Sequence, residues 1–211
     1  MKINKKLLII TSILLFLPMI AGLILWSRLP DSIATHFGPD NAANGWSSKP
    51  FAVFAIPGIM LALHWLCLFA TAADPKSDKI GKKALAIVYW ILPLVSLCVM
   101  SFTYANALGV SVNVGFWCCL MVGILLIVLG NYMPKARQNY TFGIKTPWAL
   151  EDEENWNKSN RLAAWLAIFA GLILIVNAFI LSIPVLIVTV VIFGGVPVLY
   201  SYYLYRKKKK E

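Results

Sequence analysis

The feature that most constrains this chain is a set of six long apolar stretches, none of which contains Asp, Glu, Lys or Arg. They run over residues 7–26, 51–73, 84–108, 112–132, 162–181 and 184–205. A helix needs about 20 apolar residues to cross the hydrocarbon core of a bilayer. One charge at its centre would cost about 2.5–3.5 kcal/mol. The sequence therefore predicts an all-α, polytopic membrane protein with six transmembrane helices.

Composition agrees with a chain whose surface faces lipid. Hydrophobic residues make up 60% of the 211 residues and charged residues 13%, against about 45–50% and about 25% in soluble domains. The net charge of +10 would suggest nucleic acid as the partner of a soluble protein. Here the Lys and Arg residues lie at the ends of the apolar stretches. The expected partner is therefore the lipid bilayer, with no direct contact to nucleic acid.

The positions of the basic residues predict an orientation. Of the 19 Lys and Arg residues, all except Arg28 and Lys49 lie in the N-terminal tail, residues 74–83, residues 133–161 or the C-terminal tail. Because cytoplasmic loops of membrane proteins are enriched in Lys and Arg, both termini and the 133–161 loop are predicted to be cytoplasmic. The 27–50 loop is then extracytoplasmic. Two parts are expected: residues 1–73 with the outer loop, and residues 84–211 with the inner loop.

Small and polar residues within the stretches predict how the helices pack. Triplets of small residues at four-residue spacing, Gly115, Cys119 and Gly123 and then Ala163, Ala167 and Gly171, predict that the fourth and fifth spans are neighbours. Polar side chains within the spans include His64, Asn106, Asn131 and Asn177. They favour hydrogen bonds between helices. The alternative is a pathway through the membrane, as in a small transporter or channel subunit.

The two segments outside the spans differ in character. In the outer segment, Pro30 and Asp31 predict a helix start with Asp31 as its cap, followed by a turn-rich stretch. Phe37 and Trp46 are expected to fold this segment back against the membrane surface. In the inner segment, an acidic run over residues 151–154 predicts a helix N-terminus. This fits either a short amphipathic helix on the inner leaflet or a docking surface for a cytoplasmic protein.

Both segments also carry motifs that resemble known families. The outer segment, with LPDSI, HFG and GW..K, resembles a bacterial domain of unknown function. The inner segment, with GNYMPKARQN, GIKTPWAL and E..W.K.NR, resembles the SdpI family, whose named member is the immunity and signal-transduction membrane protein of a sporulation-delaying toxin system. Lys145 stands where relatives commonly have Arg, and Asn160 where many have His.

The resemblance implies a bacterial membrane protein that protects the cell against a secreted peptide toxin. It further implies recruitment of a winged-helix transcriptional autorepressor to the cytoplasmic side. The sequence has no set of serine, histidine and acid at one membrane depth and no cluster of metal ligands, so we expect no enzyme activity, cofactor or metal. The positions that match the family motif, and so the candidate partner-binding residues, are Asn131, Pro134, Asn139, Gly143, Lys145, Thr146, Pro147, Trp148, Trp156 and Arg161. The candidate toxin-facing residues are His36, Phe37 and Trp46. The oligomeric state stays open.

Overall fold

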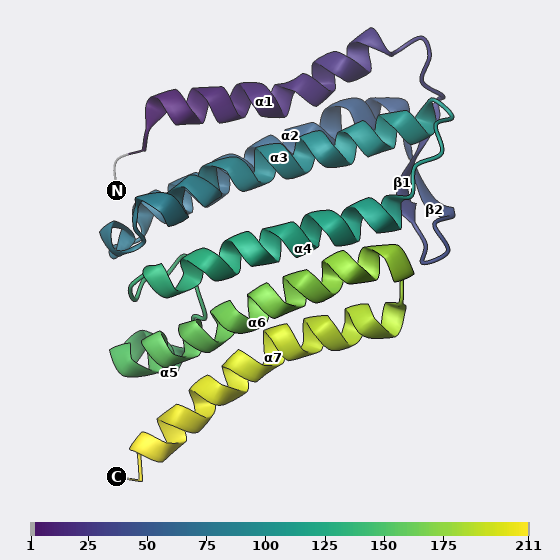
Figure 1. Cartoon of the computed structure of the whole chain (residues 1–211). Helices are drawn as coiled ribbons and strands as arrows, with labels where there is room; N and C mark the ends of the chain where they lie inside the picture. The colour runs from purple at the N-terminus through teal and green to yellow at the C-terminus, as the bar shows by residue number, and fades with distance from the viewer. Residues whose placement is uncertain (1–2, 211) are drawn as a thin grey trace. The chain divides into compact units, whose positions relative to one another are not determined.

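The structure is a computed structural model that describes residues 3–210. In that part of the chain, six helices are long and apolar enough to cross a membrane, which confirms the predicted spans (Figure 1). They are α1 (Lys5–Ile24), α2 (Ile56–Ala73, preceded by a π-helical turn at Phe51–Ala55), α3 (Lys82–Ala107), α4 (Val114–Tyr132), α6 (Glu153–Ile180) and α7 (Ile183–Lys208). The remaining helix, α5 (Pro147–Glu151), and the 3₁₀ turns Ser77–Lys79 and Met133–Lys135 are short.

The helices belong to two compact units. Residues 3–69 and 88–115 form one, here the hairpin unit, and residues 70–87 and 116–210 form the other, here the connection unit. The helices α2, α3 and α4 each pass from one unit into the other.

The hairpin unit contains two strands where the sequence predicted a helix start. Strands β1 (Ser32–Phe37) and β2 (Ala43–Ser48) pair antiparallel, so the helix predicted to begin at Asp31 is wrong. The Asp31 carboxylate instead pairs with the ammonium of Lys49 at 3.0 Å, at the open end of the hairpin where β1 begins and β2 ends. The turn between the strands contains Asn41 at a φ of +61°, a conformation that Asn tolerates better than most residues. The predicted turn-rich stretch is therefore confirmed as the tip of a hairpin.

A small core fixes the hairpin to the helices of its unit. Its buried members come from the loop, the strand β1, the π-helical turn and α3; they are Leu29, Ile33, Ala52, Val53, Met100 and Tyr104. The Tyr104 hydroxyl donates to the backbone carbonyl of Pro18 in α1 at 3.0 Å. A Cβ atom added to Gly22 would lie 2.6 Å from Val53. Close approach at a glycine therefore brings α1 against the start of α2.

Polar residues join α1 to α2 within the membrane. His64 and Thr11 are both fully buried, and the His64 Nε2 lies 2.9 Å from the Thr11 hydroxyl. At the next residue of each helix, the Trp65 indole donates to the Ser12 hydroxyl at 3.0 Å. The interpretation of His64 as a hydrogen-bonding residue between helices is thus confirmed. A role for His64 in a transport pathway stays a prediction.

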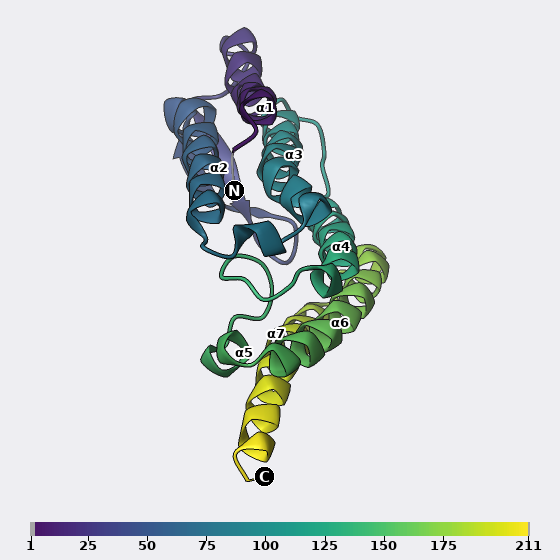
Figure 2. The same cartoon turned by 90° about the vertical axis from the view of Figure 1, so that its left-hand side faces the viewer.

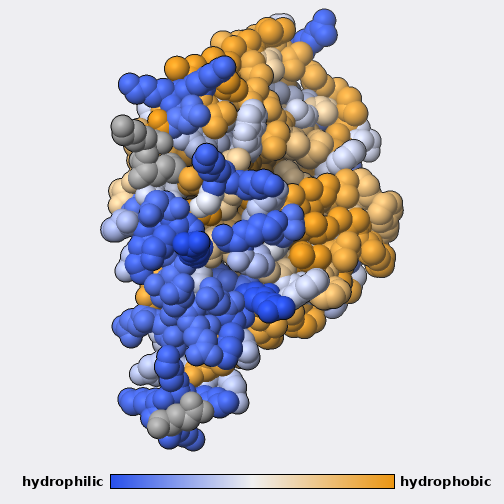
Figure 3. All heavy atoms as spheres, turned by 60° about the vertical axis from the view of Figure 1, so that its left-hand side comes forward, coloured by the Kyte–Doolittle hydropathy of each residue, from blue (hydrophilic) through white to orange (hydrophobic). Residues whose placement is uncertain are grey.

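In the connection unit, α4 and α6 pack at small residues. A Cβ atom added to Gly123 would lie 2.7 Å from the backbone carbonyl oxygen of Gly171, and one added to Gly130 would lie 2.6 Å from that of Ala164. Small residues allow such a close approach between membrane helices. The predicted contact between the fourth and fifth spans is confirmed. Figure 3 shows hydrophilic residues gathered along one side of the view, while apolar residues cover much of the rest.

Candidate functional site

The candidate site is the segment between α4 and α6, residues 133–152, here called the α4–α6 connection. It contains a 3₁₀ turn, an irregular stretch and the short helix α5, and it ends at Asp152. Asp152 caps α6, because its carboxylate accepts the backbone N–H of Glu154 at 3.0 Å. The prediction of a helix N-terminus in the acidic run is confirmed. That run does not form a separate amphipathic helix on the membrane surface, since it opens the same helix that continues as a membrane span.

Asn139 organises the irregular stretch from its centre. Its side chain is fully buried. The Nδ2 group donates to the carbonyls of Arg137 (2.7 Å) and Phe142 (3.1 Å), and Oδ1 accepts the N–H groups of Thr141 (2.9 Å) and Phe142 (2.6 Å). A side-chain amide offers two donors and an acceptor with two lone pairs. Because all four are used within the loop, Asn139 shapes the connection and offers no free group to a partner.

Trp156 and Gly143 meet beneath the loop. Trp156 is fully buried and its indole Nε1 donates to the carbonyl of Ala136 at 3.2 Å. Gly143 has a φ of +123°, and an added Cβ atom would lie 3.1 Å from the Trp156 ring. Asn160 accepts the N–H of Ile144 at 2.8 Å and donates to the carbonyl of Trp156 at 3.0 Å. The structure therefore brings the motif residues Gly143 and Trp156 together inside the protein. Asn160 supports the same stretch through its two hydrogen bonds.

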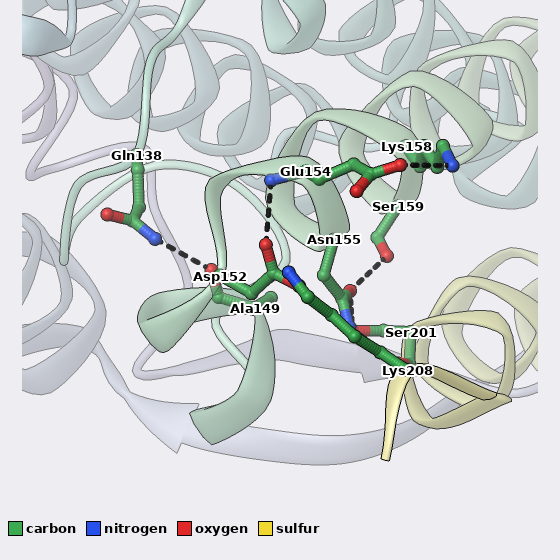
Figure 4. A network of polar contacts seen from close by, with 9 residues as sticks. All are labelled: Gln138, Ala149, Asp152, Glu154, Asn155, Lys158, Ser159, Ser201 and Lys208. Atoms are coloured by element: carbon green, nitrogen blue, oxygen red, sulfur yellow. Dashed lines mark hydrogen bonds and ion pairs between the residues drawn. The ribbon is translucent and has the colours of Figure 1, made fainter. Parts of the chain in front are cut away.

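A second buried amide ties the start of α6 to α7 (Figure 4). The Nδ2 group of Asn155 donates to the backbone carbonyl of Ser201 at 2.8 Å, and its Oδ1 accepts the hydroxyls of Ser201 (2.7 Å) and Ser159 (2.9 Å). The Thr146 hydroxyl, just before α5, lies 2.8 Å from the Ser201 hydroxyl. Thr146 is thus a motif residue with an internal partner.

Sequence reasoning missed Asn155 and Ser201. Small polar residues near helix ends are common, and the contact between these two depends on how α6 and α7 pack.

Asp74 is a further residue that sequence reasoning missed. It follows α2 directly and is 6% exposed. Its Oδ2 accepts the N–H of Tyr140 (2.9 Å) and the hydroxyl of Thr141 (2.8 Å), and its Oδ1 accepts the N–H of Lys76 (2.7 Å). The available signal was an acidic residue at the end of an apolar stretch, in a turn otherwise rich in Lys. This carboxylate joins the α2–α3 turn to the α4–α6 connection.

Trp148 packs among aromatic side chains of α7. Its ring stacks on Tyr205 with 5.9 Å between centroids and meets Tyr202 edge-on at 5.4 Å. Its indole Nε1 is buried and finds no hydrogen-bond acceptor among the described residues. Aromatic contacts of this kind add about 0.5–1.5 kcal/mol beyond the area they bury. They hold α5 against the last turns of α7.

The exposed members of the predicted set lie on the outside of this framework. They are Asn131, Pro134, Lys145, Pro147 and Arg161. The Lys145 ammonium donates to the carbonyl of Thr141 at 3.2 Å, so its side chain lies along the surface of the loop. Pro147 occupies the first turn of α5. These residues are accessible to a partner, and their part in binding one stays a prediction.

Charged residues surround a small cavity between the start of α6 and the end of α7. The cavity has a volume of about 140 Å³ and is lined by Asp152, Glu154, Asn155, Lys158, Leu204, Lys207 and Lys208. Lys208 pairs with Asp152 at 3.0 Å and Lys158 pairs with Glu154 at 2.6 Å. The hydrogen bond from Lys208 lowers the pKa of Asp152 below its usual value. Opposite charges therefore balance one another across most of this cavity.

The residues predicted to face a toxin lie on the hairpin. Trp46 is 59% exposed and pairs across the sheet with Ala34. His36 is also exposed, and its Nδ1 contacts the Asn44 side-chain oxygen on the neighbouring strand. Phe37 is half-buried. Asn41 at the hairpin tip accepts the N–H of Val114 at 2.8 Å, so the tip is held while the face that carries Trp46 stays open. Contact with a toxin is untested.

No group of three or more His, Cys, Asp or Glu side chains lies close enough to hold a metal ion within residues 3–210.

Comparison with known proteins follows the same two segments. Over residues 135–201 the sequence matches the SdpI/YfhL protein family, and over residues 13–61 it matches a domain of unknown function, DUF1648. It is 32% identical over 206 residues to the immunity protein SdpI of Bacillus subtilis (strain 168), covering 94% of this chain and 96% of that protein. No solved structure matches it.

Proposed function

Because the chain belongs to the SdpI family, we propose that this multi-pass bacterial membrane protein is an immunity protein that protects its cell against a secreted peptide toxin. The observation that carries this proposal is the similarity over nearly the full length to a protein named for immunity. The match includes the hairpin as well as the connection. Similarity over the hairpin and over the connection supports a protective role that uses both segments.

We also propose that the hairpin is extracytoplasmic and that the α4–α6 connection is cytoplasmic. Support comes from the basic residues, all but two of which lie at the termini, in the α2–α3 turn or in the 133–161 segment. A single cysteine placed at Lys145, in a variant without the native cysteines, tests this. An impermeant thiol reagent added outside intact cells should leave it unlabelled, whereas labelling would reverse the orientation.

On this orientation the hairpin is the part that a secreted toxin meets first. His36 and Trp46 are exposed there, with Trp46 at 59% exposure, and Phe37 is half-buried. Aromatic side chains bury a large area at little cost in conformational entropy, which suits contact with a membrane-active peptide. The hairpin is therefore the proposed contact site for the toxin.

The connection is the proposed docking site for an autorepressor of the winged-helix type. Lys145 in the connection and Arg161 in the neighbouring α6 are exposed, and their charges suit an acidic patch on the partner. The internal contacts of Asn139, Trp156 and Thr146 provide the rigid base that a docking surface needs.

Deletion of the gene and exposure of the cells to the toxins of related strains test protection. Deletion should sensitise the cells, and a plasmid copy should restore survival. Unchanged sensitivity to all of these toxins would contradict the proposal.

Docking is tested separately with Lys145→Glu and Arg161→Glu, which should abolish recruitment of a fluorescent repressor to the membrane while protection persists. Glu151→Lys, a reversal at an exposed site of the same segment, is the matched control.

A further inference from the structure

We propose that Asp74 is a positioning residue that couples the α2–α3 turn to the α4–α6 connection and so sets the surface offered to the cytoplasmic partner. This inference rests on the proposed function. It adds a residue outside the predicted set and outside the matched family regions, which cover residues 13–61 and 135–201.

The geometry around the carboxylate singles out Asp74. Each of its two oxygens accepts hydrogen bonds, one from the turn at Lys76 and the other from the connection at Tyr140 and Thr141. A buried carboxylate needs such donors, because an ionised group without them would be costly to remove from water. The side chain therefore bridges two segments that lie 66 residues apart in the sequence.

Neighbouring contacts join the same two segments. The N–H of Arg137 donates to the carbonyl of Lys79 at 3.1 Å. The Lys76 ammonium donates to the Gln138 side chain at 2.8 Å and lies 5.2 Å from the centre of the Tyr140 ring. Together with the bonds of Asp74, these contacts attach four residues between 137 and 141 to the turn, so a shift of the turn would act on this stretch.

The bridge continues from residues 137–141 to the exposed part of the connection. The Gln138 amide donates to the carbonyl of Ala149 in α5 at 3.0 Å (Figure 4). The Lys145 ammonium donates to the carbonyl of Thr141, the residue whose hydroxyl binds Asp74. The placement of α5 and of Lys145 thus depends on the segment that Asp74 holds.

The chain itself supplies a route from the hairpin to this bridge. Strand β2 ends at Ser48, the π-helical turn begins at Phe51, and α2 then runs to Ala73, immediately before Asp74. Asp74 therefore directly follows the helix that links the hairpin to the connection unit along the chain; α2 is labelled in Figure 2.

The substitution Asp74→Asn tests the bridge with minimal change in shape. An Asn side chain has a single acceptor oxygen, so it can satisfy either the turn or the connection but not both. Asp78→Asn is the matched control, because Asp78 lies in the same turn and is exposed. Thr141→Val removes one of the donors from the connection side and should give an intermediate effect.

The first measurement is limited digestion of the purified full-length protein with trypsin, with the cut sites identified by mass spectrometry. A protease acts on the opened form of a loop, so the rate reports how often the loop opens. Cleavage after residues 135, 137 and 145 should be about tenfold faster in Asp74→Asn, which corresponds to about 1.4 kcal/mol. It should be unchanged in Asp78→Asn. Equal rates in the two variants would overturn the bridging role.

The second measurement is recruitment of the fluorescent repressor in cells exposed to toxin, at matched protein levels. Asp74→Asn should lose at least about 80% of the recruited signal, in line with a tenfold shift, and Asp78→Asn should retain it. If Asp74→Asn opens the connection to trypsin yet recruits as the native chain does, the inference is wrong. If the native chain recruits no repressor, the proposed docking function fails, while the trypsin result still decides whether Asp74 holds the connection.

Discussion

The hairpin and the α4–α6 connection both lie outside the membrane-spanning helices, yet they are held by different kinds of contact. The hairpin is a backbone ladder whose inner side rests on an apolar core that includes Ile33 and Val53. The connection has little regular structure. Buried side-chain amides hold it, since Asn139 and Asn160 are each at most 2% exposed and bond to its backbone groups.

This difference bears on what a motif residue does in each segment. In the hairpin the backbone supplies the hydrogen bonds, so the side chains of His36 and Trp46 remain exposed. In the connection the backbone groups bond to side chains, so motif residues such as Asn139 and Trp156 use their polar groups within the protein and stabilise the loop. Substitutions there should act mainly through stability, whereas those on the hairpin should act through binding.

The largest expected effect comes from Trp156→Ala. Removing a fully buried indole costs about 3–5 kcal/mol of unfolding free energy, and here it also leaves the Ala136 carbonyl without its donor. The matched control is Trp165→Ala on the same helix, because Trp165 is 56% exposed. The unfolding temperature of the purified protein measures both. If Trp165→Ala were the more damaging change, the connection would not depend on its internal tryptophan.

Gly143→Ala should lower the unfolding free energy by less, about 2–3 kcal/mol. Two causes contribute, and a second variant separates them. The new methyl group would meet Asn160 and the Trp156 ring, and the residue would be held at a φ of +123°, which costs about 1–3 kcal/mol for a non-glycine residue. Gly81→Ala isolates the second effect. Gly81 has a φ of +81° and nothing within 4 Å of an added Cβ atom. Equal losses in the two variants would show that the contact with Trp156 is unimportant.

The membrane fold could be read from the sequence because lipid imposes a simple rule. A span must be long, apolar and free of charge, so all six were found from their composition. The contact between Gly123 and Gly171 was also predictable, since small residues at fixed spacing mark close helix packing. The hairpin was not. Its strands are short, and Pro30 and Asp31 carry a helix-start signal that the pairing of β1 with β2 overrides.

The candidate site was predicted in outline only. Motif matching located the connection, but it could not distinguish Asn139, which is buried, from Lys145, which is exposed. Partners that determine these roles lie far away in sequence. Asp74 reaches across 66 residues to Tyr140, and Asn155 reaches across 46 to Ser201. Such pairs depend on tertiary packing and leave no local pattern to detect.

Trp46→Ala should have little effect on stability, below about 0.5 kcal/mol as for most surface sites, and a large effect on protection. Trp46 is exposed and its strand partner Ala34 remains paired through the backbone. Survival in the presence of toxin and the unfolding temperature are to be measured on the same variant. Trp165→Ala, another exposed tryptophan, should leave survival unchanged. Full protection by Trp46→Ala would remove this residue from the toxin contact.

The smallest expected effect is that of the ion pair between Lys208 and Asp152, which lies at the edge of the connection. A hydrogen bond from Lys208 lowers the pKa of Asp152 below the usual 3.8. A carboxylate whose pKa is depressed in the folded state stabilises that state at neutral pH, and the contribution disappears as the pH falls through the depressed value. Lys208→Met should therefore lower the unfolding temperature slightly at pH 7, with the difference from the native chain vanishing in acid well below pH 3.8. Lys209→Met, which removes an equal charge at an exposed neighbouring site, should show no such dependence on pH. If the unfolding temperature of Lys208→Met stays below that of the native chain in strong acid, Lys208 acts through the packing of its methylene chain. The edge of the connection, like its centre, would then be held without ion pairs.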